Sequence, residues 1–181
     1  MTKIQLDMID FEKAQEMINC EKFVVVEGEH KEIISLNQTY PMNCRLELTT
    51  CDGDISFIWD IKQSSKNTIR LSLHCMDEDS KLGLIRVDYN AGHINPETAT
   101  DTLPECFKPY IAKKFTDDEH HVHYHVPGYK PLAWALPIED SMLKVKSVSD
   151  KKLESDIIDA IYSFAETINL KTTILIHPIL L

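Results

Sequence analysis

Histidines alternate with other residues along one short segment, the run His120-His121-Val122-His123-Tyr124-His125-Val126. Because side chains alternate between the two faces of a strand, an extended conformation places His121, His123 and His125 on one face. Neighbours in this set would lie about 6.6–6.8 Å apart, which suits two ligands of one ion or two proton-transfer groups. His121 and His125 would lie about 13 Å apart, too far to share an ion. A metal site here would therefore need a neighbouring pair and a third ligand. The candidates for that ligand are His74, Asp88 and His93.

A second group of chemically capable residues precedes the histidine run. In the predicted strand from Leu82 to Tyr89, Arg86 and Asp88 share one face with Leu84, and a turn containing His93 follows. An arginine fork binds phosphate well, and a histidine beside a carboxylate can act as an acid or a base. Phosphodiester cleavage needs two proton-transfer groups and a cation. The sequence thus predicts a catalytic set of Arg86, Asp88, His93, His121 and His123.

Three further residues are predicted to bind the substrate. Arg70 and His74 lie on the polar face of the preceding strand, from Ile69 to Cys75, and would join the same patch if the two strands form a hairpin. Tyr124, within the histidine run, is the third. A purely structural interpretation stays open, in which the histidines line a solvated surface strand and Arg86 and Asp88 form an exposed ion pair.

The elements that would position these residues indicate an α+β fold. Apolar residues at helical spacing predict a helix from Asp10, a suitable N-cap, to Cys20, and a longer amphipathic helix from Asp150 to Asn169. Between them, alternating segments predict strands, including a hairpin of residues 45–50 and 55–61 around Asp52-Gly53. We expect one domain over residues 1–181, mainly an antiparallel sheet with a helix at each end, the N-terminal one short and the C-terminal one long.

Composition restricts the partners and the compartment. With 19 basic and 29 acidic residues, the formal net charge of −10 argues against a broad nucleic-acid or anionic membrane surface, although a local basic pocket stays compatible with it. The first ten residues lack the apolar stretch of a secretion signal, and no apolar run is long enough to span a membrane. Five cysteines without a CxxC pair indicate reduced, mostly buried thiols. The predicted location is the cytoplasm.

The segment from Leu84 to Pro137 resembles TumE-like toxins of bacterial toxin–antitoxin modules and their uncharacterised prokaryotic relatives. The similarity rests on Ile85-Arg86-Val87-Asp88-Tyr89-Asn90, His93-Ile94-Asn95-Pro96, His121-Val122-His123 and Trp134-Ala135-Leu136-Pro137. These correspond to an arginine–aspartate strand, a histidine-containing turn and a later HxH. The resemblance marks Arg86, Asp88, His93, His121 and His123 and implies a toxin-like ribonuclease with an antitoxin partner.

Three hypotheses follow, and they leave open whether the protein is an enzyme. The first is a metal-independent ribonuclease without a cofactor, in which histidines act as general acid and base and Arg86 binds the scissile phosphate. The second is an acidic binding or inhibitor protein that docks on a basic nucleic-acid-binding protein. The third is a metal-dependent hydrolase that uses an HxH pair. The predicted partners are RNA, a basic protein, an antitoxin or a second copy of the chain, with no membrane.

Overall fold

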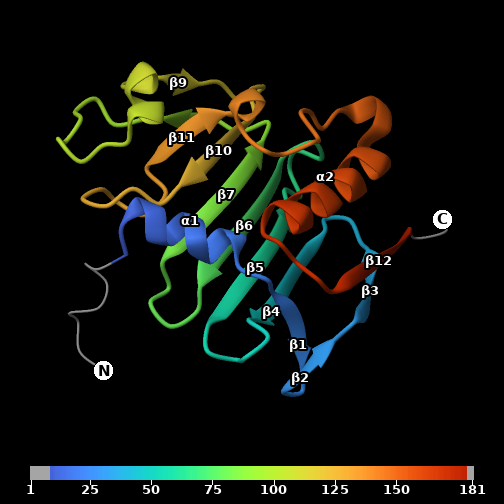
Figure 1. Ribbon diagram of the computed structural model, residues 1–181. Helices are drawn as coiled ribbons and strands as arrows, with labels where there is room; N and C mark the ends of the chain where they lie inside the picture. The colour runs from blue at the N-terminus through green and yellow to red at the C-terminus, as the bar shows by residue number, and fades with distance from the viewer. Residues whose placement is uncertain (1–8, 179–181) are drawn as a thin grey trace.

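The computed structural model describes residues 9–178. The main-sheet strands are β1 (Phe23–Val26), β2 (Glu29–Lys31), β4 (Asn43–Thr49), β5 (Ser56–Gln63), β6 (Leu71–Asp77), β7 (Gly83–Tyr89), β10 (His121–Tyr124) and β11 (Trp134–Pro137). They form one eight-stranded antiparallel sheet in the order β11–β10–β7–β6–β5–β4–β1–β2 (Figure 1).

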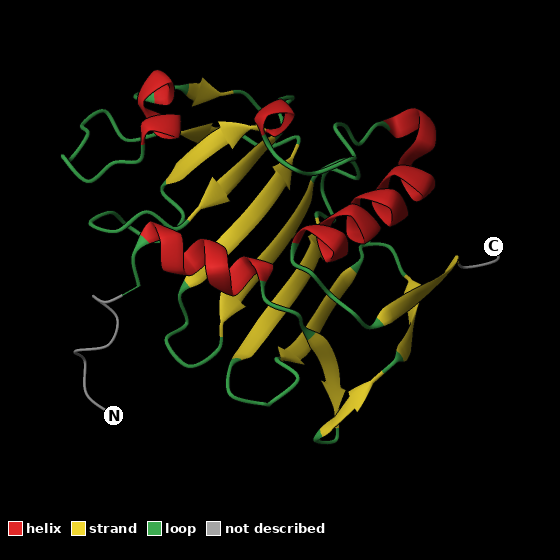
Figure 2. Ribbon diagram, in the orientation of Figure 1, coloured by secondary structure: helices red, strands yellow, loops and turns green. Residues whose placement is uncertain are grey.

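Two helices lie across one face of this sheet, α1 (Phe11–Asn19) and α2 (Leu153–Thr167) (Figure 2). Short 3-10 helices cover Glu105–Tyr110, Ile138–Asp140 and Asp150–Lys152. Two small sheets complete the fold: β3 (Ile33–Gln38) pairs in parallel with β12 (Thr173–Pro178), and β8 (His93–Ile94) pairs with β9 (Lys114–Phe115). The predicted α+β class, mainly antiparallel with a helix near each end, is confirmed.

The helix starts and the tight turns follow their local sequence. Asp10 caps α1, and its carboxylate accepts a hydrogen bond from the Lys13 amide at 2.7 Å. The predicted hairpin forms between β4 and β5, and Gly53 takes the positive φ of 78° that the turn requires. A second tight turn lies at Glu27 and Gly28, both with positive φ, and it pairs β1 with β2. The following strand, β3, pairs with β12 instead of joining the main sheet.

The two faces of the main sheet differ in character. Toward the helices, the alternating residues of β6 and β7 are fully buried in the main hydrophobic core, which also contains Trp59, Val122 and Phe164. On the opposite face, a polar row crosses the central strands, because the register pairs Asp60 with His74 and His74 with Arg86. This polar face carries the candidate site.

The long connection between β7 and β10 wraps around the free edge of β11. On the polar face, the His93 ring of β8 lies 4.5 Å from the His123 ring. At the edge, the Asn95 side chain pairs with both the amide and the carbonyl of Ala135, as a neighbouring strand would. On the helix side, Phe107 packs against Trp134. The connection therefore covers the edge strand and encloses one end of the polar face.

Neither helix within residues 9–178 combines the length and apolar composition needed to cross a bilayer. The expectation of mostly buried cysteines is wrong. Cys75 is buried, Cys20 and Cys44 are partly buried, and Cys51 and Cys106 are exposed. All five are free thiols, as expected. The segment expected to lack a secretion signal lies mainly in residues 1–8, outside the described part of the chain.

Candidate functional site

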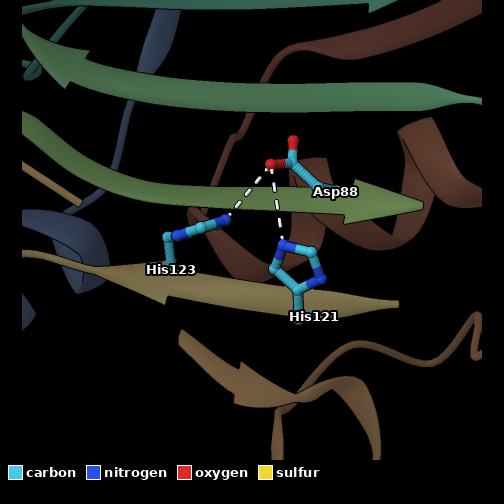
Figure 3. A group of neighbouring side chains, drawn as sticks. All are labelled: Asp88, His121 and His123. Atoms are coloured by element: carbon cyan, nitrogen blue, oxygen red, sulfur yellow. Dashed lines mark hydrogen bonds and ion pairs between the residues drawn. The ribbon is translucent and has the colours of Figure 1, made fainter. Parts of the chain in front are cut away.

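The register between β7 and β10 brings the predicted residues together. Asp88 lies directly opposite His121, and Arg86 lies directly opposite His123. Because directly paired residues point to the same face, all four side chains share the polar face. Figure 3 shows both imidazoles extending from β10 toward the Asp88 carboxylate on β7. The interstrand pairing, across more than thirty residues of intervening chain, creates the cluster.

His123 is fixed by hydrogen bonds at both ring nitrogens. Its Nδ1 lies 2.8 Å from the Leu132 carbonyl oxygen, which can only accept, so Nδ1 carries a hydrogen. In the neutral ring, Nε2 then presents a lone pair. That lone pair faces the Arg86 guanidinium, with Nη2 at 3.0 Å, and the Asp88 carboxylate, with Oδ2 at 3.1 Å. With no hydrogen on Nε2, this atom accepts from Arg86, and two lone pairs face each other between His123 and Asp88. When Nε2 carries a hydrogen, it donates to Asp88 Oδ2, and a metal cation could take the place of that hydrogen.

The Asp88 carboxylate is held in its ionised form. Burial opposes its ionisation, but a hydrogen bond donated by His123 Nε2, when that atom carries a hydrogen, and the charge of Arg86 outweigh burial and keep the pKa of Asp88 well below its usual range. Arg86 Nε donates to Asp88 Oδ2 at 2.9 Å. Ser72 lies directly across on β6, and the proximity of its hydroxyl also lowers this pKa.

His121 is enclosed without a hydrogen-bond partner. Its side chain is 0% exposed, and both ring nitrogens are buried with no partner among the described residues. Its ring lies 4.6 Å from the Phe115 ring, and its Nε2 lies 3.9 Å from Asp88 Oδ2. Burial is the main reason that the pKa of His121 falls to about 3. The side chain is therefore a neutral imidazole, and the Asp88 carboxylate oxygen lies too far from its Nε2 for a hydrogen bond.

His93 completes the group of rings. It lies 5.5 Å from the His121 ring and 4.5 Å from the His123 ring, centroid to centroid. Its Nε2 donates to the Ala133 carbonyl at 3.0 Å, and burial, with the charge of His123, lowers its pKa. All five residues predicted as catalytic are therefore neighbours in the structure. Their catalytic role stays a prediction.

The three predicted substrate-binding residues lie in different places. His74 is next to Arg86 on the polar face. Arg70 makes an ion pair with Asp117 at 2.6 Å and a hydrogen bond to the Asn90 carbonyl, so its guanidinium is held by the loops after β7. Tyr124 points to the face opposite the histidines and packs on Phe107, because it alternates with them along β10. It therefore lies away from the cluster, and its substrate-binding role stays a prediction.

The structural alternative of a solvated histidine strand is also wrong, because His121 and His123 are 0% exposed. The reason is the cover formed by β8 and β9, which the sequence alone did not place. His125 is buried as well, but its Nε2 donates to the Ile9 carbonyl and it lies beyond the end of β10. The predicted Arg86–Asp88 ion pair is present, and it is mostly enclosed: Arg86 is 33% and Asp88 13% exposed.

Burial of the histidines predicts acid-sensitive stability. Burial, and then the Arg86 charge, lowers the pKa of His74 to about 4, whereas unfolded histidine titrates near 6.5. Between these values the unfolded chain binds more protons, so stability falls as the pH drops from about 6.5 toward 4. Each such histidine contributes up to about 1.4 kcal/mol per pH unit. We expect urea unfolding of metal-free protein to show this loss, and His74→Gln to make it shallower.

Exposed His30 provides the control for that measurement. His30→Gln should leave the pH dependence of the unfolding free energy unchanged. A His74→Gln protein whose stability falls with acid as steeply as the wild type would contradict the assignment.

The cluster contains a set of metal-ligand atoms. One atom each from Asp88, His121 and His123 lies within 4.8 Å of the others, and all three residues are buried. Ligand atoms that lie about 2.0–2.2 Å from one ion are roughly 3–4 Å from one another. Small side-chain movements would therefore bring these three atoms to the separations found in a metal site. Two imidazoles and one carboxylate form a set that binds Zn²⁺, Fe²⁺ or Mn²⁺ and leaves coordination positions open.

Sequence reasoning missed the groups that orient this set. Ser72 lies on the polar face, and its alternation with His74 was a usable signal. The Leu132 and Ala133 carbonyls, which fix His123 and His93, carry no signal in the side-chain pattern. Phe115 encloses His121 from a two-residue strand too short to be recognised by periodicity.

Comparison with family models, curated proteins and solved structures gives one result. A family model matches residues 9–170, which include every residue of the cluster. No curated protein and no solved structure matches. Because the matched region covers most of the chain, the protein belongs to DUF6978, a family of unknown function.

Proposed function

We propose that this protein is a metal-dependent hydrolase whose ion is held by Asp88, His121 and His123. The observation that carries the proposal is His121, a fully enclosed imidazole 3.9 Å from an ionised carboxylate, whose two ring nitrogens have no hydrogen-bond partner within residues 9–178. Leaving buried polar atoms without partners costs free energy that an apolar residue would avoid. A cation bound by both Asp88 and His121 would give the His121 Nε2 lone pair a partner and would explain why an imidazole is buried here.

His123 supports the same function. Metal-bound histidine usually donates its second ring N–H to a carbonyl or carboxylate, which fixes the tautomer and directs the other lone pair at the ion. The Leu132 carbonyl does this for His123 and leaves Nε2 facing Asp88 Oδ2. Three protein ligands, rather than four, are typical of catalytic sites with room for water or substrate.

The surroundings favour an anionic substrate such as a phosphodiester. The open side of the cluster is the Arg86 side, because Arg86 is 33% exposed whereas both histidine ligands are 0% exposed. A bound divalent ion would supply a water of lowered pKa and stabilise developing negative charge. Arg86 would bind the phosphate oxygens, and the rings of His93 and Phe115 would exclude bulk water from the ligands.

The test uses protein purified without a histidine tag. We expect about one equivalent of Zn²⁺ or Mn²⁺ to bind and to support hydrolysis of bis(p-nitrophenyl) phosphate or an RNA oligonucleotide. EDTA should remove the activity, and Asp88→Asn should lower it at least 100-fold. His30→Ala, at an exposed histidine, should retain it. Protein that binds no metal, or activity that survives both EDTA and Asp88→Asn, would contradict the proposal.

A second candidate is the metal-independent ribonuclease that the sequence predicts. It is favoured by the meeting of His93, His121, His123 and Arg86 at one point. Enclosure of both β10 histidines weakens it, because a general acid or base must reach the substrate. Retention of RNA cleavage in EDTA would favour this candidate. The toxin resemblance stays a prediction, and so do the predicted partners, which are a basic protein, an antitoxin or a second copy of the chain. The cytoplasmic location is also a prediction, and the five free thiols agree with it.

A further inference from the structure

The Arg86 guanidinium contacts two of the three proposed metal-ligand atoms. Its Nε donates to Asp88 Oδ2 at 2.9 Å, and its Nη2 lies 3.0 Å from His123 Nε2. Those oxygen and nitrogen atoms are the ones that an ion would use. In the structure, therefore, a side-chain cation occupies the position next to the ligand set.

A metal ion and this guanidinium exclude each other. An ion about 2.0–2.2 Å from His123 Nε2 would lie within about 5 Å of Arg86 Nη2 and would draw on the same lone pair. Both groups are positive, and the pocket is largely enclosed, so their repulsion is poorly screened. Binding of the ion at His123 Nε2 thus requires Arg86 Nη2 to leave that atom, and repulsion between the two positive groups favours movement of the guanidinium away from Asp88 as well.

Arg86 is partly open to solvent. Its side chain is 33% exposed, against 13% for Asp88 and 0% for His121 and His123, and His74 lies directly beside it on β6. The next carboxylate along that row, Asp60, is already bound by Arg45 at 2.7 and 2.9 Å and by Lys62 at 3.5 Å. A displaced guanidinium would therefore face solvent with its hydrogen-bond donors free.

We propose that Arg86 holds the cation position in the metal-free protein, that the metal displaces it, and that the freed guanidinium then binds the phosphate group of the substrate. This proposal rests on the proposed metal-dependent function and adds an order of binding, metal before anion. Arginine suits the second role because its planar fork pairs with two phosphate oxygens.

The first test measures metal affinity by competition with a chromophoric chelator. Arg86→Gln removes the competing charge, and we expect it to bind Zn²⁺ at least 10-fold more tightly than the wild type. Arg45→Gln is the matched control, since Arg45 also forks onto a carboxylate of the polar face but is separated from Arg86 by two intervening strands. This variant should bind Zn²⁺ as the wild type does. Equal or weaker binding by Arg86→Gln would overturn the displacement.

The second test measures phosphate binding by ³¹P NMR. Inorganic phosphate should bind the Zn²⁺-loaded wild type. It should bind the Zn²⁺-loaded Arg86→Gln protein at least 10-fold more weakly, and its binding to the metal-free wild type should be undetectable. Phosphate binding that is equal in both loaded proteins would overturn the anion-binding role. If neither protein binds Zn²⁺, the proposed function fails and this inference fails with it. If both bind Zn²⁺ equally well, the inference alone fails.

Discussion

Replacing His121 with leucine is expected to stabilise the metal-free protein while abolishing metal binding. Leucine has a similar volume, and it removes two buried ring nitrogens that have no partner among the described residues. Because each unsatisfied buried polar group costs about 1–3 kcal/mol, we expect the unfolding free energy to rise by roughly 1–2 kcal/mol. Zn²⁺ affinity should fall by more than the 10–100-fold that loss of an outer-shell partner costs.

His123→Leu is the matched control on the same strand. It also removes a proposed ligand from a fully buried position, but it deprives the Leu132 carbonyl, Arg86 and Asp88 of a partner. We expect this variant to lose metal binding and to be destabilised by about 2–4 kcal/mol. Urea unfolding of both metal-free variants gives the comparison. A His121→Leu protein that is destabilised by more than 1 kcal/mol would show that His121 serves the fold instead of an ion.

Lys22→Met is expected to cause the largest loss of stability. Lys22 is 0% exposed, and its ammonium donates to the carbonyls of Ile18, Cys20 and Ile168 at 2.8, 2.9 and 3.0 Å. These carbonyls lie at the C-terminal ends of α1 and α2, where helix dipoles favour a cation. Burial lowers the pKa of Lys22, yet the three acceptors and the Phe57 ring 4.7 Å away compensate for that cost.

Methionine keeps the length of the Lys22 side chain and leaves three carbonyls without their donor. We expect a loss of about 3–5 kcal/mol in the free energy of unfolding in urea. Lys171→Met is the control, because Lys171 is partly exposed and pairs with Glu21 at the surface. Its effect should stay within about 0.5 kcal/mol. A Lys22→Met effect below 1 kcal/mol would contradict the assigned role.

The alternation of side chains made the local part of the site predictable. Arg86 and Asp88 share one face of β7, and His121 and His123 share one face of β10, as the two-residue period requires. The turn at Gly53 and the cap at Asp10 were predictable for the same reason, since each depends on a few neighbouring residues. The antiparallel α+β class follows from the order of these elements.

The contacts that depend on distant segments were not predictable from a local pattern. The pairing of β10 with β7 determines which histidine faces Asp88, and no periodicity within either strand specifies that register. Enclosure of His121 depends on Phe115, and the role of Lys22 depends on the end of α2, near residue 168. The packing of Tyr124 on Phe107 likewise depends on the distant 3-10 helix Glu105–Tyr110.

The central claim is that Asp88, His121 and His123 together hold one metal ion. Anomalous diffraction from a crystal of tag-free, Zn²⁺-loaded protein tests it most directly. We predict one peak about 2.0–2.2 Å from Asp88 Oδ2, His121 Nε2 and His123 Nε2, with Arg86 turned away from the ion. A crystal without a peak at this position, or with Zn²⁺ bound only at other residues, would contradict the account.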